Sequence, residues 1–232
     1  MTIVITGASQ GIGAAVAEAF AAEDGTRLAL VARTEAKLDA VAAECRRLGA
    51  EAAVFPCDVT DDEAVAAMAD DVNLRLGTPD VLVNNAGAFL PGGLLDLDPA
   101  DFRAQVDVNL TSAYLVTRAF LPAMLERGRG DLFFMASVAA IRGYPGGAAY
   151  CAAKHGLLGL ARAVREETKG TGLRVTTLLP GATLTASWEG TDLPPARFMP
   201  PEDIAHALVD LHKLTGRTVA EEIILRPQRG DI

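Results

Sequence analysis

The sequence predicts an α/β fold, in which helices flank one doubly wound parallel sheet of about seven strands. Two observations predict it. Strand-like and helix-like segments take turns along the whole 232-residue chain, and most of the strand-like segments are continuous apolar runs, as expected for parallel strands covered on both faces. No repeat, low-complexity tract or linker divides the chain, so we expect residues 1–232 to form a single domain.

The expected elements follow in chain order. The strand candidates are residues 2–6, 26–32, 50–56, 80–85, 130–137, 173–180 and 221–227. About six helices fill the intervals. After the second strand, apolar side chains recur at helical spacing, at Leu38, Val41, Ala42, Cys45 and Leu48. Thr60 and Glu63 are spaced as a capping box that opens the next helix. Right-handed crossovers in such a fold put ligands at the carboxyl ends of the strands.

Composition and charge exclude several classes of protein. The net charge of −9 argues against a nucleic-acid or anionic-membrane surface, because clustered Lys and Arg hold such partners. The start MTIVITG lacks a signal-peptide pattern, and no apolar run approaches the roughly 20 residues of a membrane helix, so we expect a cytoplasmic protein. The three cysteines and three histidines show no ligand spacing, so neither a disulfide framework nor a metal site is expected.

The stretch TGASQGIG, residues 6–13, lies at the expected turn from the first strand into the first helix. Backbone N–H groups without helical partners point outward there, and glycine lets a pyrophosphate approach them closely. Gly7, Gly11 and Gly13 therefore fit a phosphate cradle. Their G-x-x-x-G-x-G spacing differs from the common G-x-G-x-x-G dinucleotide pattern, and packing alone is the alternative explanation of the stretch.

The end of the second strand indicates which dinucleotide is preferred. Sites that prefer NAD usually carry an acidic residue here, on the adenosine ribose, but this chain has Ala32 followed by Arg33. A guanidinium can face a 2′-phosphate with a planar fork of donors, which favours NADP over NAD. The alternative is that Arg33 is an ordinary surface residue.

Tyr150 and Lys154 carry the strongest chemical signal. They are four residues apart on an expected helix, so their side chains emerge one turn apart on the same face. An ammonium near a phenol favours the phenolate and lowers its pKa, which gives an acid that works closer to neutral pH. Ser137, at the end of the fifth strand, can donate a hydrogen bond to a substrate carbonyl. A buried aromatic and a solvated lysine are the alternative for any isolated YxxxK.

Seven motifs together resemble the short-chain dehydrogenase/reductase family. They are TGASQGIG, Asp58-Val59, NNAG at 84–87, Asn109 within VNL, Ser137 thirteen residues before Tyr150, YCAAK at 150–154, and PGATLT at 180–185. The resemblance extends from Ile3 to about Pro227. It implies a Rossmann-type fold and hydride transfer between a nicotinamide cofactor and a small carbonyl or alcohol.

The resemblance also implies residue roles. Asn109 would anchor a water in a proton relay, Ser137 would polarise the carbonyl, and Tyr150 would act as general acid/base. Lys154 would lower the pKa of Tyr150 and hold the nicotinamide ribose. The cofactor-binding residues would be Gly7, Ser9, Gly11, Ile12, Gly13, Arg33, Asp58, Val59, Asn85, Ala86, Gly87, Tyr150, Lys154, Pro180, Gly181, Thr183 and Thr185.

The substrate is less well defined by the sequence. Residues 183–200 are expected to form a loop over the site, with Trp188 and Phe198 as candidate substrate contacts or ordinary core anchors. Glu189 and Asp192 are candidate partners for pterin amino groups. The C-terminal part, including VAEEIILRPQRGDI, resembles the bacterial sepiapterin reductase-like members of the family. A 3-oxoacyl carrier-protein reductase, an NAD-dependent alcohol dehydrogenase and a non-enzymatic NADP sensor remain alternatives.

The family resemblance further implies a homodimer or homotetramer. The segment HGLLGLARAV after Lys154 is apolar over more than a narrow stripe, as in a helix buried on two sides. Its candidate interface residues are Leu157, Leu158, Leu160 and Val164, and the monomer core is the alternative location for them.

Overall fold

A computed structural model of the chain describes residues 1–188, 190–230 and 232. Seven parallel strands form one sheet in the order β3-β2-β1-β4-β5-β6-β7. The strands are β1 (Thr2–Thr6), β2 (Arg27–Ala32), β3 (Glu51–Pro56), β4 (Val81–Asn84), β5 (Gly130–Met135), β6 (Leu173–Pro180) and β7 (Glu222–Leu225). The predicted doubly wound parallel sheet is confirmed. Every predicted strand is present, and its ends differ from the prediction by at most about two residues, as is usual for element boundaries.

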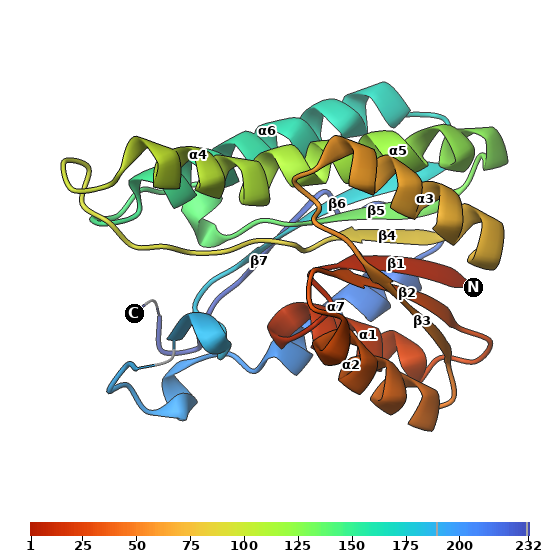
Figure 1. The fold of residues 1–232 in the computed structure, drawn as a ribbon, viewed down its shortest axis with the longest axis horizontal. Helices are drawn as coiled ribbons and strands as arrows, with labels where there is room; N and C mark the ends of the chain where they lie inside the picture. The colour runs from red at the N-terminus through yellow and green to blue at the C-terminus, as the bar shows by residue number, and fades with distance from the viewer. Residues whose placement is uncertain (189, 231) are drawn as a thin grey trace.

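Helices cover both faces of the sheet (Figure 1). The α-helices in the described residues are α1 (Gly11–Ala21), α2 (Glu35–Arg47), α3 (Asp62–Leu76), α4 (Pro99–Val106), α5 (Ser112–Arg127), α6 (Ala148–Thr168) and α7 (Pro201–His212). A π-helical turn (Asp107–Thr111) joins α4 to α5 without a break, so the helical segments match the expected number. Short 3₁₀ turns are at Val138–Ala140, Ala186–Trp188 and Pro195–Arg197.

Alternation along the central strand builds two cores. Ile3 and Ile5 of β1 pack with α1, α2 and α7 on one face, whereas Val4 packs with α3, α5 and α6 on the other. Successive side chains of a strand point to opposite faces, so a strand that must feed both cores is apolar at every position. This explains why the strands appear in the sequence as unbroken apolar runs.

The start of α3 corrects one expectation. The N-cap is Asp61, whose Oδ1 accepts a hydrogen bond from the Ala64 backbone N–H at 3.0 Å. The Thr60 hydroxyl instead donates to Asp58 Oδ1 at 2.8 Å. The capping box predicted at Thr60 and Glu63 is therefore wrong by one residue, because the Asp58 carboxylate takes the threonine hydroxyl and leaves Asp61 to cap the helix.

Helix α6 carries the residues expected either at a subunit interface or in the monomer core. Leu157, Leu158 and Val164 are buried in the core beneath the sheet, and Leu160 packs partly against the same cluster. The broad apolar face of this helix is thus explained within one chain. Leu157, Leu158 and Val164 therefore occupy the monomer core, the alternative location expected for them, whereas Leu160 is half-buried.

The chain order creates a switch point between β1 and β4. From β1 the chain proceeds outward through β2 to β3, then returns to β4 on the other side of β1 and continues to β7. The loops after β1 and β4 diverge at this point, which opens a crevice at their carboxyl ends. No helix in the described part of the chain is long and apolar enough to cross a membrane.

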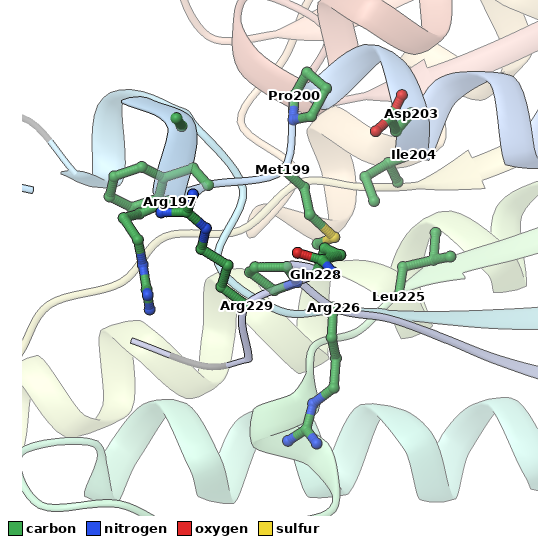
Figure 2. A pocket seen from close by; sticks show the side chains of 12 residues that line it. Arg197, Met199, Pro200, Asp203, Ile204, Leu225, Arg226, Gln228 and Arg229 are labelled. Atoms are coloured by element: carbon green, nitrogen blue, oxygen red, sulfur yellow. The ribbon is translucent and has the colours of Figure 1, made fainter. Parts of the chain in front are cut away.

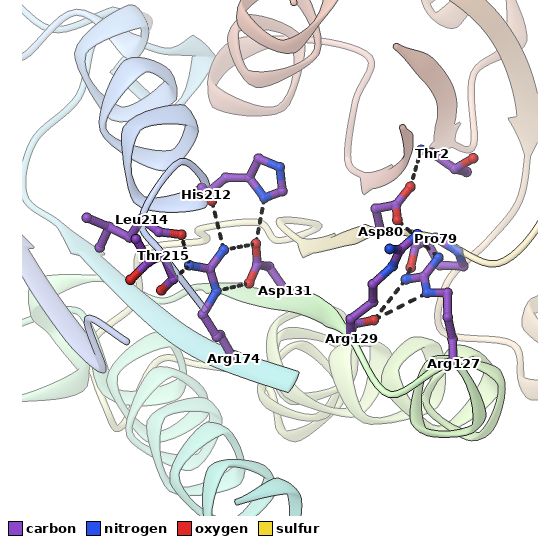
Figure 3. A network of polar contacts seen from close by, with 10 residues as sticks. All are labelled: Thr2, Pro79, Asp80, Arg127, Arg129, Asp131, Arg174, His212, Leu214 and Thr215. Carbon is purple, nitrogen blue, oxygen red and sulfur yellow. Dashed lines mark hydrogen bonds and ion pairs between the residues drawn. The ribbon is translucent and has the colours of Figure 1, made fainter. Parts of the chain in front are cut away.

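The opposite, amino-terminal edge of the sheet is closed by two arginine clamps (Figure 3). Arg174 of β6 binds Asp131 of β5 through two bonds of 2.5 and 2.7 Å, and Asp131 also accepts a bond from His212 Nδ1 at 2.6 Å. Arg127 pairs with Asp80 at 3.2 Å and donates to the Thr78 carbonyl at 2.8 Å. These pairs fasten α7 and α5 to the strand ends.

Candidate active site

A cavity of about 550 Å³ lies at the carboxyl ends of β1, β4, β5 and β6. Its lining comes from the turns after these strands and from one face of α6. The predicted site residues in the lining are Gly7, Gly11, Ile12, Asn85, Gly87, Asn109, Ser137, Tyr150, Lys154, Pro180, Gly181, Thr183, Thr185 and Trp188. The predicted residues outside it are Ser9, Gly13, Arg33, Asp58, Val59, Ala86 and Phe198.

The glycine-rich turn forms one end of the cavity. Gly7 and Gly11 have φ of +64° and +56°, a left-handed backbone conformation that residues other than glycine rarely adopt. A Cβ on Gly13 would stand 2.2 Å from the Gly7 carbonyl oxygen. Helix α1 begins at Gly11 with no acidic residue in its first turn, so its N–H groups and dipole face the cavity unopposed. This cradle fits a dinucleotide pyrophosphate.

The NNAG segment ties β4 to this turn. The Asn85 side-chain amide donates to the Thr6 and Gly7 carbonyls at 3.0 and 3.2 Å, and the Thr6 hydroxyl accepts the backbone N–H groups of Asn85 and Ala86 at 3.0 Å. Asn84 donates to the Thr117 hydroxyl at 2.9 Å. Ala86 therefore supports the cavity wall through its backbone rather than lining it.

The predicted adenosine end lies beyond the cavity. The Asp58 carboxylate accepts the backbone N–H and hydroxyl of Thr60 at 3.0 and 2.8 Å. These hydrogen bonds lower its pKa, and the nearby Arg33 charge acts in the same direction. Arg33 is exposed directly after β2. Nearby, Lys37 donates to Gln10 of the glycine-rich turn at 2.9 Å, so a second cation borders the same region.

Ser137, Tyr150 and Lys154 meet at the centre of the cavity. Ser137 lies just past β5, where its hydroxyl accepts the Ala139 N–H at 3.1 Å and caps a 3₁₀ turn. Tyr150 is in the first turn of α6, and Lys154 follows one turn later. Lys154 is 3% exposed, and its ammonium donates to the Met135 carbonyl at 2.9 Å and lies 5.6 Å from the centre of the Tyr150 ring.

Burial sets the protonation of these two groups. Burial raises the pKa of Tyr150 to about 12, although a hydrogen bond with Ser137 lowers the same pKa by a smaller amount. It lowers the pKa of Lys154 to about 8. The expectation that the pKa of Tyr150 would lie below its ordinary value is thus not met here, because desolvation dominates and the ammonium is directed at Met135.

Asn109 sits in the π-helical turn between α4 and α5. Its side-chain amide donates to the carbonyls of Ala88 and Gln105 at 2.8 and 2.9 Å, and its oxygen accepts the Ala88 N–H at 3.3 Å. A Cβ on Gly87 would stand 2.7 Å from that oxygen and 3.5 Å from Lys154 Nζ. The glycine therefore lets Asn109 and Lys154 approach each other beside the cavity.

The PGATLT segment closes the cavity from the far side. Pro180 ends β6, and the buried Thr183 donates its hydroxyl proton to the Gly181 carbonyl at 3.1 Å. Thr185 faces the start of α1, since a Cβ on Gly11 would stand 3.2 Å from its methyl group. A ligand on the glycine-rich turn would thus contact this segment as well.

Aromatic side chains flank the space left for a substrate. Trp188 lines the cavity, whereas Phe198 is buried behind it, with ring centres 5.0 Å apart. Phe89 and Tyr144 also line the cavity, and Phe89 contacts the rings of Tyr144 and Tyr150 edge to face. Glu189 lies outside the described residues, and Asp192 is exposed away from the lining.

Phe89 and Tyr144, with Gln105, are the functional candidates that the sequence interpretation missed. Phe89 follows NNAG directly, and Tyr144 lies between Ser137 and Tyr150, so position alone could have indicated both. Gln105 is one helical turn before Asn109 and clamps the Leu90 backbone with bonds of 3.2 and 2.9 Å.

No group of residues in the described ranges could hold a metal ion. Cys45, Cys57 and Cys151 are buried and free. Burial raises the pKa of Cys45 to about 12 and that of Cys57 to about 11. Cys45 and Cys57 therefore have the character of core residues rather than of reactive thiols.

Comparison with known proteins is consistent with this geometry. Residues 1–193 match the model of the "short chain dehydrogenase" family. The chain belongs to the short-chain dehydrogenase/reductase family. A sepiapterin reductase of Chlorobaculum tepidum is 37% identical over 99% of this chain and 97% of its own length.

Two solved structures extend the comparison within the family. An alcohol dehydrogenase of Thermococcus sibiricus, complexed with 5-hydroxy-NADP, superposes with a TM-score of 0.92 at 32% identity and covers 100% of this chain and 98% of its own. A metagenomic short-chain oxidoreductase in complex with NADP superposes with a TM-score of 0.87 at 37% identity and covers 98% and 97%. The protein is therefore an oxidoreductase with the fold of NADP-binding relatives, and the predicted family is confirmed.

Proposed function

We propose that the protein is an NADP(H)-dependent carbonyl reductase, which interconverts a small carbonyl compound and its alcohol. The observation that carries the proposal is the convergence of Ser137, Tyr150 and Lys154 on one cavity that also holds the glycine-rich turn. Hydride-transferring enzymes of this family need a proton donor beside a nicotinamide pocket. Tyr150 in this lining supports the proton-donor part of the proposal, and the glycine-rich turn supports the cofactor part.

The proposed roles follow from the protonation states. The dinucleotide, when bound, would supply the hydride. With a pKa of about 12, Tyr150 is a neutral phenol at pH 7 and can give its proton to the oxygen of the reduced carbonyl. Ser137 would donate a hydrogen bond to the same oxygen, which stabilises negative charge as it develops.

Lys154 and Asn109 support the proton donor in this proposal. The pKa of about 8 leaves Lys154 mainly charged at pH 7, so its ammonium can hold the nicotinamide ribose and stabilise the phenolate after proton transfer. Asn109 would anchor a water that returns a proton towards Lys154, which its proximity to Gly87 and Lys154 supports.

NADP is the proposed preference over NAD. Arg33 is exposed at the end of β2 and close enough to Asp58 to influence its pKa, so it can face an adenosine 2′-phosphate. Asp58 and Val59 would flank the adenine, and Gly181, Thr183 and Thr185 would contact the nicotinamide end. The cofactors named with the two solved relatives support this preference.

A carbonyl on a pterin side chain is the proposed finer substrate. The similarity to the Chlorobaculum protein supports it, and the aromatic lining of Phe89, Tyr144 and Trp188 suits a planar ring. A 3-oxoacyl carrier-protein reductase would instead turn over acetoacetyl thioesters, and an alcohol dehydrogenase would prefer NAD and oxidation. A non-enzymatic NADP sensor would need neither Tyr150 nor Lys154.

Tyr150→Phe tests the proposal. It should lower kcat for NADPH-dependent carbonyl reduction by about 10²- to 10⁴-fold, because only the proton donor is removed, while the Kd for NADPH changes little. Tyr114→Phe, on the exposed face of α5, is the matched control and should keep full activity. A screen over pterins, diketones, acyl thioesters and sugars identifies the substrate. Unchanged turnover of Tyr150→Phe on every reducible substrate would contradict the assignment.

We also propose that residues 1–232 act as one cytoplasmic NADP-binding domain, with residues 183–200 as its substrate loop, assembled as a homodimer or homotetramer. All seven strands belong to one sheet, which supports the single domain. The burial of Leu157 and Leu158 means that the subunit contact must use other residues. Sedimentation velocity measures the assembly state directly.

A further inference from the structure

A second cavity, of about 350 Å³, lies beside the candidate active site. Its walls are residues 196–200 of the substrate loop, the first turn of α7, and the end of β7 with the following residues 226–229. The proposed reaction uses none of this space. Figure 2 shows the cavity from close by.

The charged lining of this cavity is mainly basic, although the chain as a whole has a net charge of −9. The lining contains three guanidinium groups, of Arg197, Arg226 and Arg229, and one carboxylate, of Asp203. In Figure 2, Arg197 and Arg229 lie at one end and Asp203 lies at the other, while the Arg226 side chain extends away from the cavity. Two of the three arginine side chains, Arg197 and Arg229, therefore lie at the same end of the cavity.

These two arginines differ in their surroundings. Arg197 is half-buried and already engaged in a contact within the protein. Arg229 is exposed, and no acidic side chain of the described residues forms an ion pair with it. Its guanidinium can thus turn towards a ligand without breaking a native ion pair.

We propose that this cavity binds a small oxyanion, with the charge and size of inorganic phosphate, between Arg197 and Arg229. Guanidinium groups offer planar pairs of donors that match phosphate and carboxylate oxygens, and the neighbouring Gln228 amide adds a neutral donor. The apolar part of the lining, which includes Phe198 and Ile204, reduces screening by water and strengthens the attraction.

The site is connected to the active site through the substrate loop. Phe198 lines the second cavity and packs against Trp188, which lines the first. Met199 donates to the Ala182 carbonyl at 3.0 Å and accepts the Leu184 N–H at 2.8 Å. An oxyanion held on Arg197 would therefore steady the segment that closes the active site, and the KM for the carbonyl substrate should fall.

The single tryptophan of the chain, Trp188, reports binding without any need for activity. Inorganic phosphate is titrated against chloride at constant ionic strength, and a saturable change in tryptophan fluorescence is expected. Arg229→Gln should weaken the apparent affinity about tenfold, and Arg197→Gln/Arg229→Gln should abolish the response. Arg217→Gln removes one exposed charge outside both cavities and should leave the response unchanged.

Arg33→Ala separates this site from the proposed 2′-phosphate site, because phosphate bound near β2 would lose its response in that variant and phosphate bound here would keep it. The proposal is overturned if the wild-type protein gives no saturable response, or if Arg197→Gln/Arg229→Gln responds like the wild type. Neither outcome bears on the reductase activity, which the Tyr150 variant tests.

The oxyanion can be a free ion or an acidic group of the substrate itself. Phosphate that competes with the reduction of a keto acid, but not with that of the matched neutral ketone, identifies the substrate's acidic group. Phosphate that lowers the KM for both compounds to the same extent identifies a free ligand. In either case the effect should disappear in Arg229→Gln.

Discussion

The two ends of the sheet use buried charge in opposite ways. At the amino end, Asp131 forms an ion pair with Arg174 and a hydrogen bond with His212 (Figure 3). At the carboxyl end, Lys154 is almost fully buried, and its ammonium donates a hydrogen bond to the neutral Met135 carbonyl. Paired charge holds the strands to the helices, whereas Lys154 retains a charge that can act on a ligand. One end favours stability and the other favours chemistry at some cost in stability.

The largest effect on the free energy of unfolding is expected from a substitution at the amino end of the sheet. Asp131→Ala leaves the Arg174 charge without its carboxylate and should lower the free energy of unfolding by about 3–5 kcal/mol. Because the change is at the far edge of the sheet, kcat per folded molecule should stay near the wild-type value. Urea unfolding and steady-state assays measure the two effects, with the exposed Asp70→Ala as control. A large loss of kcat in folded Asp131→Ala would mean that the two ends are not separable.

Lys154→Met should give the opposite result. Reduction should fall by about 10²-fold or more, while the free energy of unfolding at pH 7 should rise by about 1 kcal/mol or more, since a buried ammonium is removed at the cost of one hydrogen bond. The pKa of Lys154 is about 8 in the folded protein and 10.5 is its ordinary value. The burial penalty is therefore complete below pH 8 and is lost as pH rises towards 10.5.

The stability difference between Lys154→Met and the wild type should accordingly shrink between pH 8 and 10.5. Urea titrations at pH 7 and pH 10 measure it. A difference that grows with pH in this range would show that Lys154 is stabilised by its environment rather than destabilised.

The smallest effect is expected at the rim of the carboxyl end, where charge is exposed to water. Arg33→Ala should lower the NADPH:NADH ratio of kcat/KM by about tenfold, because one exposed guanidinium contributes about 1.4 kcal/mol of discrimination. Arg103→Ala, on the exposed face of α4, serves as the matched control. An unchanged ratio would contradict the role of Arg33 and would leave Lys37, the other cation of that rim, as the candidate for binding the 2′-phosphate.

The fold was predictable because each strand of a covered parallel sheet contributes side chains to two cores. Consecutive residues of such a strand are therefore all apolar, as Ile3, Val4 and Ile5 are. Most of the predicted motif residues line one cavity, because strand ends meet at one edge of such a sheet. Features that depend on competing contacts were not predictable. The cap of α3 moved to Asp61 because Asp58 takes the Thr60 hydroxyl, a choice that local spacing does not encode.

Protonation was the least predictable part of the candidate site. The spacing of Tyr150 and Lys154 is correct for a shared helix face, but the direction of a pKa shift depends on how much water reaches each group and on where the ammonium points. The Met135 carbonyl, which takes the Lys154 bond, has no sequence signal. The sequence around Phe198 likewise does not show whether this side chain contacts the substrate or packs behind Trp188.

The π-helical turn at Asp107–Thr111 has a consequence for how this region can vary. A π-helical turn contains one residue more than the α-helical turn that could replace it. It therefore rotates the side chains of α5 about the helix axis relative to those of α4. Deleting one residue would restore a regular helix and its backbone bonds. It would also rotate Asn109 away from Ala88 and Gly87. The irregular turn therefore keeps Asn109 in contact with the Ala88 backbone at the expense of regular helical hydrogen bonds.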